Sequence, residues 1–308
     1  MPHTWELRGS LWHACTGGSL QRARHVVTNA SVKPFLRWAG GKSRIIRHLL
    51  ECLPEDPYQD YWEPFLGSAA LFFALKPETA HLSDSNPDLI ACYGQVRDRP
   101  EVVYRSLRTH LQSTSEEYYY EMRRQYNRCR LTKRRRSAAQ AARFIYLNRT
   151  SFNGIFRVNR EGNYNVPYGF KEPPPAPDST VLQAASRLLQ GASLSDEQYY
   201  AVLAGDVVRA GDLVYLDPPY PPLARTANFT HYTASRFSWN DQERVRAVAD
   251  GLRKRGCFVM ISNTSIEPIR ELYAGWHLHE LPVTRWVAAD GSRRKVADLV
   301  ITSYRIHT

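Results

Sequence analysis

The tetrapeptide Asp217-Pro218-Pro219-Tyr220 places three chemically useful groups directly after an apolar stretch, "LVYL". Two successive prolines fix φ and cannot donate backbone hydrogen bonds, so the chain leaves a predicted strand in a rigid turn. Such a turn holds a carboxylate, a proline carbonyl and an aromatic ring in a fixed relation. This trio suits an exocyclic amino group on a planar base: the carboxylate and the carbonyl each accept one N–H, while the ring stacks on the base.

The chemistry that follows is methyl transfer to that amino group. Its nitrogen is a poor nucleophile because its lone pair is conjugated into the ring. Holding both hydrogens tips the nitrogen toward tetrahedral geometry and frees the lone pair for in-line attack on a methyl group. A purely structural Pro-Pro turn is the alternative, but it explains only the prolines and leaves Asp217 and Tyr220 without a reason.

A second stretch, "FLRWAGGKSR", ends with the Gly-Lys-Ser that closes a phosphate-binding loop. A full loop reads G-x-x-x-x-G-K-[ST], and Leu36 occupies the place of its first glycine. Leucine does not supply the positive φ of glycine, and its side chain crowds the approach of a phosphate. The sequence therefore argues against nucleotide hydrolysis, and this stretch needs another role.

Composition limits the class of protein. With 308 residues, 43% of them hydrophobic, the chain can bury a large core as one domain or as a domain with an insertion. It has no apolar run long enough to span a membrane, and residues 1–31, which lack a secretory signal, are predicted to be a loosely ordered extension. Five scattered cysteines without a C-x-x-C pair indicate reduced thiols and a cytoplasmic location. His277 and His279 have no third ligand nearby in sequence, so no metal site is predicted.

The formal charge of +11 and the isoelectric point near 9.5 favour a polyanionic partner. From Arg123 to Arg136 the sequence runs "RRQYNRCRLTKRRR", in which every charged residue is basic. This basic run predicts contact with nucleic acid. A solvated helix face is the plainer alternative, and an anionic membrane surface is a weaker one because the run lacks a broad apolar face.

The first part of the chain reads as an α/β sheet domain. An amphipathic helix is predicted over 45–53, followed by a strand, a glycine turn and an apolar helix in "DYWEPFLGSAALFFAL". A second strand ends at Asp84 in "AHLSDSNPDLIACY" and leads into another helix. Strand, turn and helix in this order are typical of doubly wound folds.

The middle of the chain differs in character. Residues 97–147 are helical and basic in pattern, and "FRVNREGNYNV" predicts a hairpin with its turn at Glu161-Gly162. A proline cluster, "EPPPAPD", then separates this region from "DLVYLDPPY", where the α/β rhythm resumes. We therefore predict an α/β protein with a Rossmann-like doubly wound sheet formed by residues 32–96 and 178–308. Residues 97–177 are predicted to be a mainly helical insertion that carries the β-hairpin.

Five motifs in a fixed order make the chain resemble a known family. From about Val32 to Ile306, the order of "FLRWAGGK", "EPFLGSAALFF", "LSDSNPDLI", "NRTSFNGIFRVNREGNYNVPYG" and "YLDPPY", the last followed by "ANFTHYTASRFSWNDQ", is similar to that of the Dam-type DNA adenine-N6 methyltransferases. Any single motif could arise by chance, but the ordered set is specific. The resemblance implies a Rossmann-like methyltransferase fold and S-adenosylmethionine as the cofactor.

The resemblance also implies a cofactor site. Lys42 is expected to pair with the cofactor carboxylate, and Asp84 with the ribose hydroxyls. The family commonly has a second glycine at the position of Ala69. This departure is expected to affect the affinity for the cofactor. The residues expected at the cofactor are Trp38, Ala39, Gly40, Lys42, Glu63, Pro64, Phe65, Gly67, Asp84 and Asp217.

The same resemblance implies the substrate. Related enzymes that act on cytosine N4 usually begin the tetrapeptide with serine, and those that act on RNA or protein glutamine usually begin it with asparagine. Asp217 therefore favours adenine, flipped out of duplex DNA. A DNA-reading region in the middle of the chain fits the order of the motifs. An RNA adenine methyltransferase and a catalytically silent DNA-binding protein are the alternatives, and the presence of both Lys42 and Asp217 argues against the second.

The insertion is the expected DNA reader. Its Arg157 matches a position that the family uses at the DNA surface, and arginine can donate two hydrogen bonds to guanine O6 and N7. The hairpin predicts GATC, or a site containing GAT, as the target. A companion restriction endonuclease is possible and is not needed for activity. The residues expected at DNA are Lys33, Arg134, Arg135, Asn148, Arg149, Asn153, Arg157, Tyr164 and Pro167.

Overall fold

A computed structural model describes residues 32–170, 176–221, 237–289 and 292–306. The segment 1–31, predicted to be a loosely ordered extension, lies outside the described residues. Within the described ranges, no helix is both long and apolar enough to cross a membrane.

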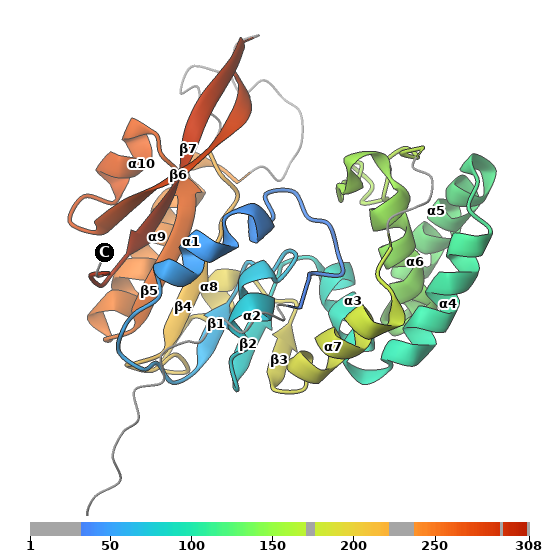
Figure 1. Cartoon of the computed structure of the whole chain (residues 1–308), viewed down its shortest axis with the longest axis horizontal. Helices are drawn as coiled ribbons and strands as arrows, with labels where there is room; N and C mark the ends of the chain where they lie inside the picture. The colour runs from blue at the N-terminus through green and yellow to red at the C-terminus, as the bar shows by residue number, and fades with distance from the viewer. Residues whose placement is uncertain (1–31, 171–175, 222–236, 290–291, 307–308) are drawn as a thin grey trace, which may run out of the picture.

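The centre of the fold is a seven-stranded sheet in the order β3-β2-β1-β4-β5-β7-β6 (Figure 1). Strands β1 to β5 are parallel, while β7 runs antiparallel to both β5 and β6. The chain starts in the middle of the sheet, moves outward to β3 and then returns to add β4 on the other side of β1, which confirms the doubly wound fold. The strands are β1 Tyr61–Glu63, β2 Ala80–Ser83, β3 Ala192–Ser195, β4 Leu213–Leu216, β5 Phe258–Thr264, β6 His277–Ala289 and β7 Ser292–Thr302.

Both faces of the sheet are covered by helices. Along β4, Leu213 and Tyr215 belong to one hydrophobic core, and Val214 and Leu216 belong to the other. This alternation follows from the period-two geometry of a strand, and a continuous apolar run is typical of strands buried on both faces. The helices of the sheet domain are η1 Lys42–Arg44, α1 Ile46–Glu51, α2 Ala70–Leu75, α3 Pro87–Asp98, α8 Tyr199–Val202, α9 Trp239–Lys254 and α10 Glu267–Leu272.

The predicted insertion is helical and lies beside the sheet (Figure 1). Ser115 and Ser137 cap two of its helices by accepting hydrogen bonds from backbone N–H groups in the first turn. Its helices are α4 Pro100–Gln112, α5 Glu116–Arg130, η2 Lys133–Arg136 and α6 Ala138–Thr150. The following helix, α7 Ser179–Leu189, packs against α3 and α4 and joins the insertion to the sheet domain.

The predicted hairpin is present in a compact, irregular form. Two isolated antiparallel bridges join Ser151 to Tyr168 and Val158 to Tyr164, and the short helix η3, Phe152–Gly154, directly follows Ser151. The turn lies at the predicted place, because Gly162 has φ +79° and its N–H donates to the Asn159 carbonyl at 2.9 Å.

Strand β3 and helix α7 are among the elements that the sequence did not predict; the short helices α8 and α10 are others. Strand β3 and helix α7 both lie before "DLVYLDPPY", where the α/β pattern was expected to resume. Strand β3 reads "ASLS", which is short and half polar because it lies at the edge of the sheet and pairs only with β2. An edge strand of this kind lacks the apolar signal of β4.

Candidate active site

A cavity of about 520 Å³ lies at the carboxyl ends of the parallel strands, where open α/β sheets bind ligands. Four segments far apart in sequence line it: the "WAGGK" loop, the turn after β1, Asp84 after β2, and Asp217–Tyr220 after β4. Of the residues predicted to bind the cofactor or to act in catalysis, all except Pro64 border this cavity. The fold therefore brings together groups that the sequence only placed in order.

Several aromatic walls of the cavity were missed by the sequence analysis. Tyr199, from the short helix α8, stacks on Phe65 with ring centroids 5.0 Å apart. Phe237, just before α9, meets the same ring edge-on at 6.1 Å. Tyr199 lies outside every motif of the resemblance, and Phe237 lies within the stretch that follows the tetrapeptide but was given no role there. Only tertiary packing reveals both as walls of the cavity.

The glycine turn after β1 depends on close packing with the "WAGGK" loop. Gly67 has φ +47°, and a Cβ added there would lie 2.7 Å from Cδ1 of Trp38. Both the backbone conformation and the available space therefore require glycine. The indole of Trp38 also stacks on Phe156 of the hairpin region, with centroids 5.7 Å apart and an interplanar angle of 18°. The "WAGGK" loop is thus packed between the glycine turn and the predicted DNA reader.

Ala69 adopts the conformation that the family's glycine would supply easily. Its φ of +55° lies in the left-handed region, and its side chain is fully buried. For a non-glycine residue this conformation costs roughly 1–2 kcal/mol. The departure at Ala69 is therefore accommodated as backbone strain at the start of α2, and its effect on cofactor affinity stays a prediction.

Asp84 presents its carboxylate at the cavity and is fixed by the backbone. Its two oxygens accept hydrogen bonds from the N–H groups of Gly67, at 3.1 Å, and Asn86, at 2.9 Å. Burial raises the pKa of the Asp84 carboxyl above its usual value, and these two hydrogen bonds oppose that rise. The carboxylate thus has a fixed orientation from which its remaining lone pairs can meet hydroxyl groups.

The carboxylate of Asp217 forms a close ion pair with Lys42. The Lys42 Nζ lies 2.5 Å from Oδ1 and 2.6 Å from Oδ2, and it also donates to the Gly40 carbonyl at 2.8 Å. The same ammonium lies 4.8 Å from the centroid of the Tyr220 ring. Lys42 therefore joins the "WAGGK" loop to the tetrapeptide, and its expected contact with a cofactor carboxylate stays a prediction.

Glu63 contributes a second carboxyl group to the same cavity. It is buried, and its Oε2 accepts a hydrogen bond from the Tyr61 hydroxyl at 2.8 Å. Burial raises the pKa of Glu63 to about 8; the negative charge of Asp217 adds to the rise, while the Tyr61 hydrogen bond and Lys42 oppose it. Glu63 is therefore mainly protonated at neutral pH, so the positive charge of Lys42 is balanced by the carboxylate of Asp217.

The residues predicted to meet DNA fall into two groups. In the exposed group, Arg157 lies on the hairpin, and its Nε donates to Asn165 Oδ1 at 2.9 Å. This contact holds the arginine across the hairpin. The exposed residues are Lys33, Arg134, Asn153, Arg157 and Pro167.

The other group makes contacts inside the protein. Asn148 is buried and bonds both backbone groups of Arg37 at 2.8 Å. Arg149 donates to the Phe35 carbonyl at 2.9 Å, and burial lowers its pKa to about 10. Tyr164 is also buried. A DNA role for these residues stays a prediction.

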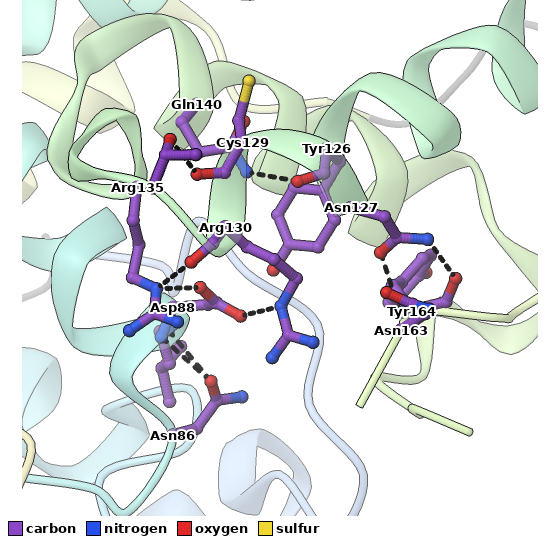
Figure 2. Close-up of polar contacts among 12 residues, drawn as sticks. Asn86, Asp88, Tyr126, Asn127, Cys129, Arg130, Arg135, Gln140, Asn163 and Tyr164 are labelled. Atoms are coloured by element: carbon purple, nitrogen blue, oxygen red, sulfur yellow. Dashed lines mark hydrogen bonds and ion pairs between the residues drawn. The ribbon is translucent and has the colours of Figure 1, made fainter. Parts of the chain in front are cut away.

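Arg135 also belongs to the internal group, because it approaches a buried acid on α3 (Figure 2). The side chain of Asp88 is only 2% exposed. Its Oδ2 lies 2.9 Å from Arg130 Nε, and its Oδ1 lies 3.1 Å from Arg135 Nε. The Arg135 Nε also donates to the Arg130 carbonyl at 2.6 Å. Two arginines of the basic run thus attach the insertion to the start of α3, just beyond Asp84.

The described parts of the chain hold no group of three or more histidine, cysteine, aspartate or glutamate side chains arranged to bind a metal ion.

Comparison with known proteins identifies the family. The family described as D12 class N6 adenine-specific DNA methyltransferase matches residues 38–286. The type II methyltransferase M1.LlaDCHI of Lactococcus lactis subsp. cremoris is 37% identical over 281 residues, covering 89% of this chain and 96% of that protein. Type II methyltransferase M.MjaIII of Methanocaldococcus jannaschii is 36% identical over 295 residues, with 89% and 99% coverage. The DNA adenine methylase of Escherichia coli K12 is 34% identical over 277 residues, with 89% and 95% coverage.

These matches extend over most of the chain, and the family match at residues 38–286 includes every segment that lines the cavity. The chain therefore belongs to the D12 class of N6 adenine-specific DNA methyltransferases.

Proposed function

We propose that the chain methylates N6 of an adenine flipped out of duplex DNA, with S-adenosylmethionine as methyl donor, at GATC or another site containing GAT. The observation that carries this proposal is the convergence of the "WAGGK" loop, Asp84 and the tetrapeptide on one cavity. When bound, S-adenosylmethionine supplies an electrophilic methyl group.

The residues around the cavity fit this donor. Asp84 offers a fixed carboxylate for the ribose hydroxyls, and Phe65 and Trp38 offer aromatic faces for an adenine ring. The backbone of the "WAGGK" loop and Gly67 form the walls between them. Calorimetry on Asp84→Ala tests this arrangement: we expect weaker S-adenosylmethionine binding, and unchanged affinity would place the donor elsewhere.

The tetrapeptide orients the amino group of the target base. The Pro219 carbonyl already accepts a hydrogen bond from Gln242 Nε2 at 2.7 Å, which favours the Pro218 carbonyl as the acceptor for the base. Asp217, held by Lys42, accepts the second N–H. Flipping the base costs a few kcal/mol. Stacking on Tyr220 returns roughly 1–3 kcal/mol.

The hairpin supports a target that contains guanine. Arg157 is exposed and held across the hairpin by Asn165, so its guanidinium is ordered before DNA binds. A bidentate arginine contact with guanine contributes roughly 1–3 kcal/mol of discrimination.

Mapping N6-methyladenine in DNA from cells that express the chain tests reaction, base and target together. We expect a methylated GAT-containing motif in the wild type. Arg157→Ala should relax the preference for guanine about tenfold, the low end of the discrimination expected for a bidentate contact. Arg160→Ala, which removes an equal charge from the same hairpin, should keep the motif. A wild-type motif without GAT would exclude the proposed target, and methylation of structured RNA in preference to duplex DNA would exclude the proposed substrate.

A further inference from the structure

Two fully buried amides connect the catalytic turn to the sheet. Gln242, in the first turn of α9, is 0% exposed, and its Nε2 donates to the Pro219 carbonyl at 2.7 Å. Its Oε1 accepts from Nδ2 of Asn263 on β5 at 3.1 Å. Asn263 is also 0% exposed, and its Oδ1 accepts from the Thr264 N–H at 2.8 Å.

The direction of every hydrogen bond in this chain is determined by its two ends. The Pro219 carbonyl can only accept, so Gln242 must present its NH₂ group and turn its oxygen toward Asn263. The Thr264 N–H can only donate, so Asn263 must present its oxygen there and its NH₂ group to Gln242. Flipping either amide would leave two hydrogen-bond donors, or two acceptors, facing each other.

The bonded carbonyl belongs to the one peptide plane in the turn that the prolines leave soft. The rings of Pro218 and Pro219 fix φ at both residues. Residues that precede proline are restricted in ψ, which covers Asp217, Pro218 and also Tyr220, because Pro221 follows it. Of the three peptides between Asp217 and Tyr220, only the last has both of its flanking torsions, ψ of Pro219 and φ of Tyr220, left unrestricted. The Gln242 hydrogen bond holds that peptide by its oxygen.

Burial of two amides needs a reason beyond packing. A buried amide costs free energy unless each of its groups is paired, and an apolar side chain of similar size would fill the space without that requirement. The start of α9 is itself fixed by a capping box between Ser238 and Asp241. Strand β5, which carries Asn263, pairs directly with β4, which leads into the turn. The turn is thus held from the two elements that adjoin it.

We propose that Gln242, oriented by Asn263, is a positioning residue that fixes the peptide between Pro219 and Tyr220 and so sets where the Tyr220 ring meets the target base. The proposal rests on the proposed function of Asp217–Tyr220 as the catalytic turn. It assigns Gln242 no contact with the substrate.

The first experiment replaces Gln242 by methionine, which keeps length and loses the N–H donor. We expect single-turnover methylation at saturating DNA and S-adenosylmethionine to fall about 10- to 100-fold, as for a misplaced reactive group. Val245→Ala is the matched control, because Val245 is fully buried on the same helix but has no bond to the turn. Affinity for S-adenosylmethionine should change little in either variant. A rate for Gln242→Met equal to that of Val245→Ala would overturn the proposal.

A second experiment distinguishes positioning from loss of stability. Gln242→Glu keeps the acceptor for Asn263, but its ionised form cannot donate to Pro219, whereas its protonated form can. The rate of Gln242→Glu relative to wild type should therefore rise as pH falls. Lys42, Glu63, Asp217, Tyr220 and Asp241 are ionisable groups near the turn or beside the substitution, and comparison with wild type at each pH compensates for their titration. A relative rate independent of pH would contradict the proposal.

Asn263→Asp tests the direction of the chain at a residue one step further from the turn. An ionised aspartate accepts from both Thr264 and Gln242, so the Gln242 amide should reverse and present its oxygen to the Pro219 carbonyl. We expect a loss of rate similar to that of Gln242→Met, and little further loss in the double variant, because both changes act on one contact. Additive losses of rate would show that the two substitutions act separately, and would refute the proposed hydrogen-bond chain from Asn263 through Gln242 to Pro219. Inactive wild-type protein would instead refute the proposed function.

Discussion

The proposed catalytic turn, Asp217–Tyr220, and the basic run, Arg123–Arg136, are both short stretches of unusual composition. In the turn, the groups that act together are neighbours in the chain, and two prolines restrict the torsions between them. The structure keeps that relation and adds outside supports at Lys42 and Gln242. In the basic run, residues of the same charge have very different surroundings.

The structure divides the basic run by partner. Arg130 and Arg135 approach the buried Asp88. Arg123 donates to the Val166 carbonyl at 3.2 Å. A third set is exposed, comprising Arg124, Arg128, Lys133, Arg134 and Arg136.

The difference shows how far a side chain's role is fixed locally. In a short turn restricted by proline rings, the local sequence fixes how the side chains lie relative to one another. The order of residues is therefore enough to predict which groups act together. Arginine has a long flexible stem, and its partner depends on which acid or carbonyl the fold brings within reach. A charge run therefore predicts the sign of a surface, but not which of its members are available to phosphate.

The largest expected effect tests the turn. Asp217→Ala removes the carboxylate proposed to accept the target N–H, and by analogy with other preorganised partners the single-turnover rate should fall at least about 10²–10³-fold. DNA affinity, measured by fluorescence anisotropy, should stay nearly unchanged because the basic surface is intact. Near-normal methylation by this variant would refute the catalytic assignment.

The next effect tests whether the basic run includes a structural part. Asp88→Asn leaves Arg130 and Arg135 without their buried acid, and breaking a buried pair of this kind typically costs about 3–5 kcal/mol of unfolding free energy. Arg244→Gln breaks the ion pair with Asp241, in which the arginine is largely exposed, and should cost less than about 1 kcal/mol. Urea denaturation of both variants measures the difference. Equal losses of unfolding free energy would mean that arginines paired with a buried acid stabilise the fold no more than an exposed arginine does.

The third effect concerns the carboxyl of Glu63 beside the turn and is measured per pH unit. Because burial raises the pKa of Glu63 from its ordinary 4.5 to about 8, the folded protein binds more protons than the unfolded chain between these values. Stability contributed by this group is therefore fully present below pH 4.5 and declines as pH rises to about 8, with a slope of at most about 1.4 kcal/mol per pH unit. Glu63→Gln keeps an acceptor for Tyr61 and should flatten that decline in urea titrations. An unchanged pH profile would mean that Glu63 is ionised in the folded protein.

The smallest effect separates two neighbours in the basic run. Arg134 is exposed, so Arg134→Gln should reduce the slope of log affinity against log salt by about 0.9 if it neutralises one phosphate. Arg135→Gln should leave that slope nearly unchanged and lower stability, because Arg135 approaches Asp88. Titrations with duplex DNA at several salt concentrations provide the measurement. Equal slope changes would return Arg135 to the phosphate-binding group.

The sequence by itself determined the α/β fold class, the helical character of residues 100–150, the place of the hairpin turn and the order of the motifs. These depend on local features: apolar periodicity for the strands and helices, the glycine at the hairpin turn, and restricted torsions at Asp217–Tyr220. The family resemblance rests on the same ordered motifs. Local patterns suffice here because each feature concerns residues that are neighbours in the chain.

Only the tertiary structure decided which distant residues meet. The pairing of Lys42 with Asp217, the aromatic walls at Tyr199 and Phe237, and the Gln242–Asn263 chain all join different elements. The same holds for Asp88, which selects two arginines from a uniformly basic run. Such contacts depend on how the sheet order places the ends of β1, β2, β4 and β5 beside one another, and no spacing along the chain encodes the distance between side chains on separate strands.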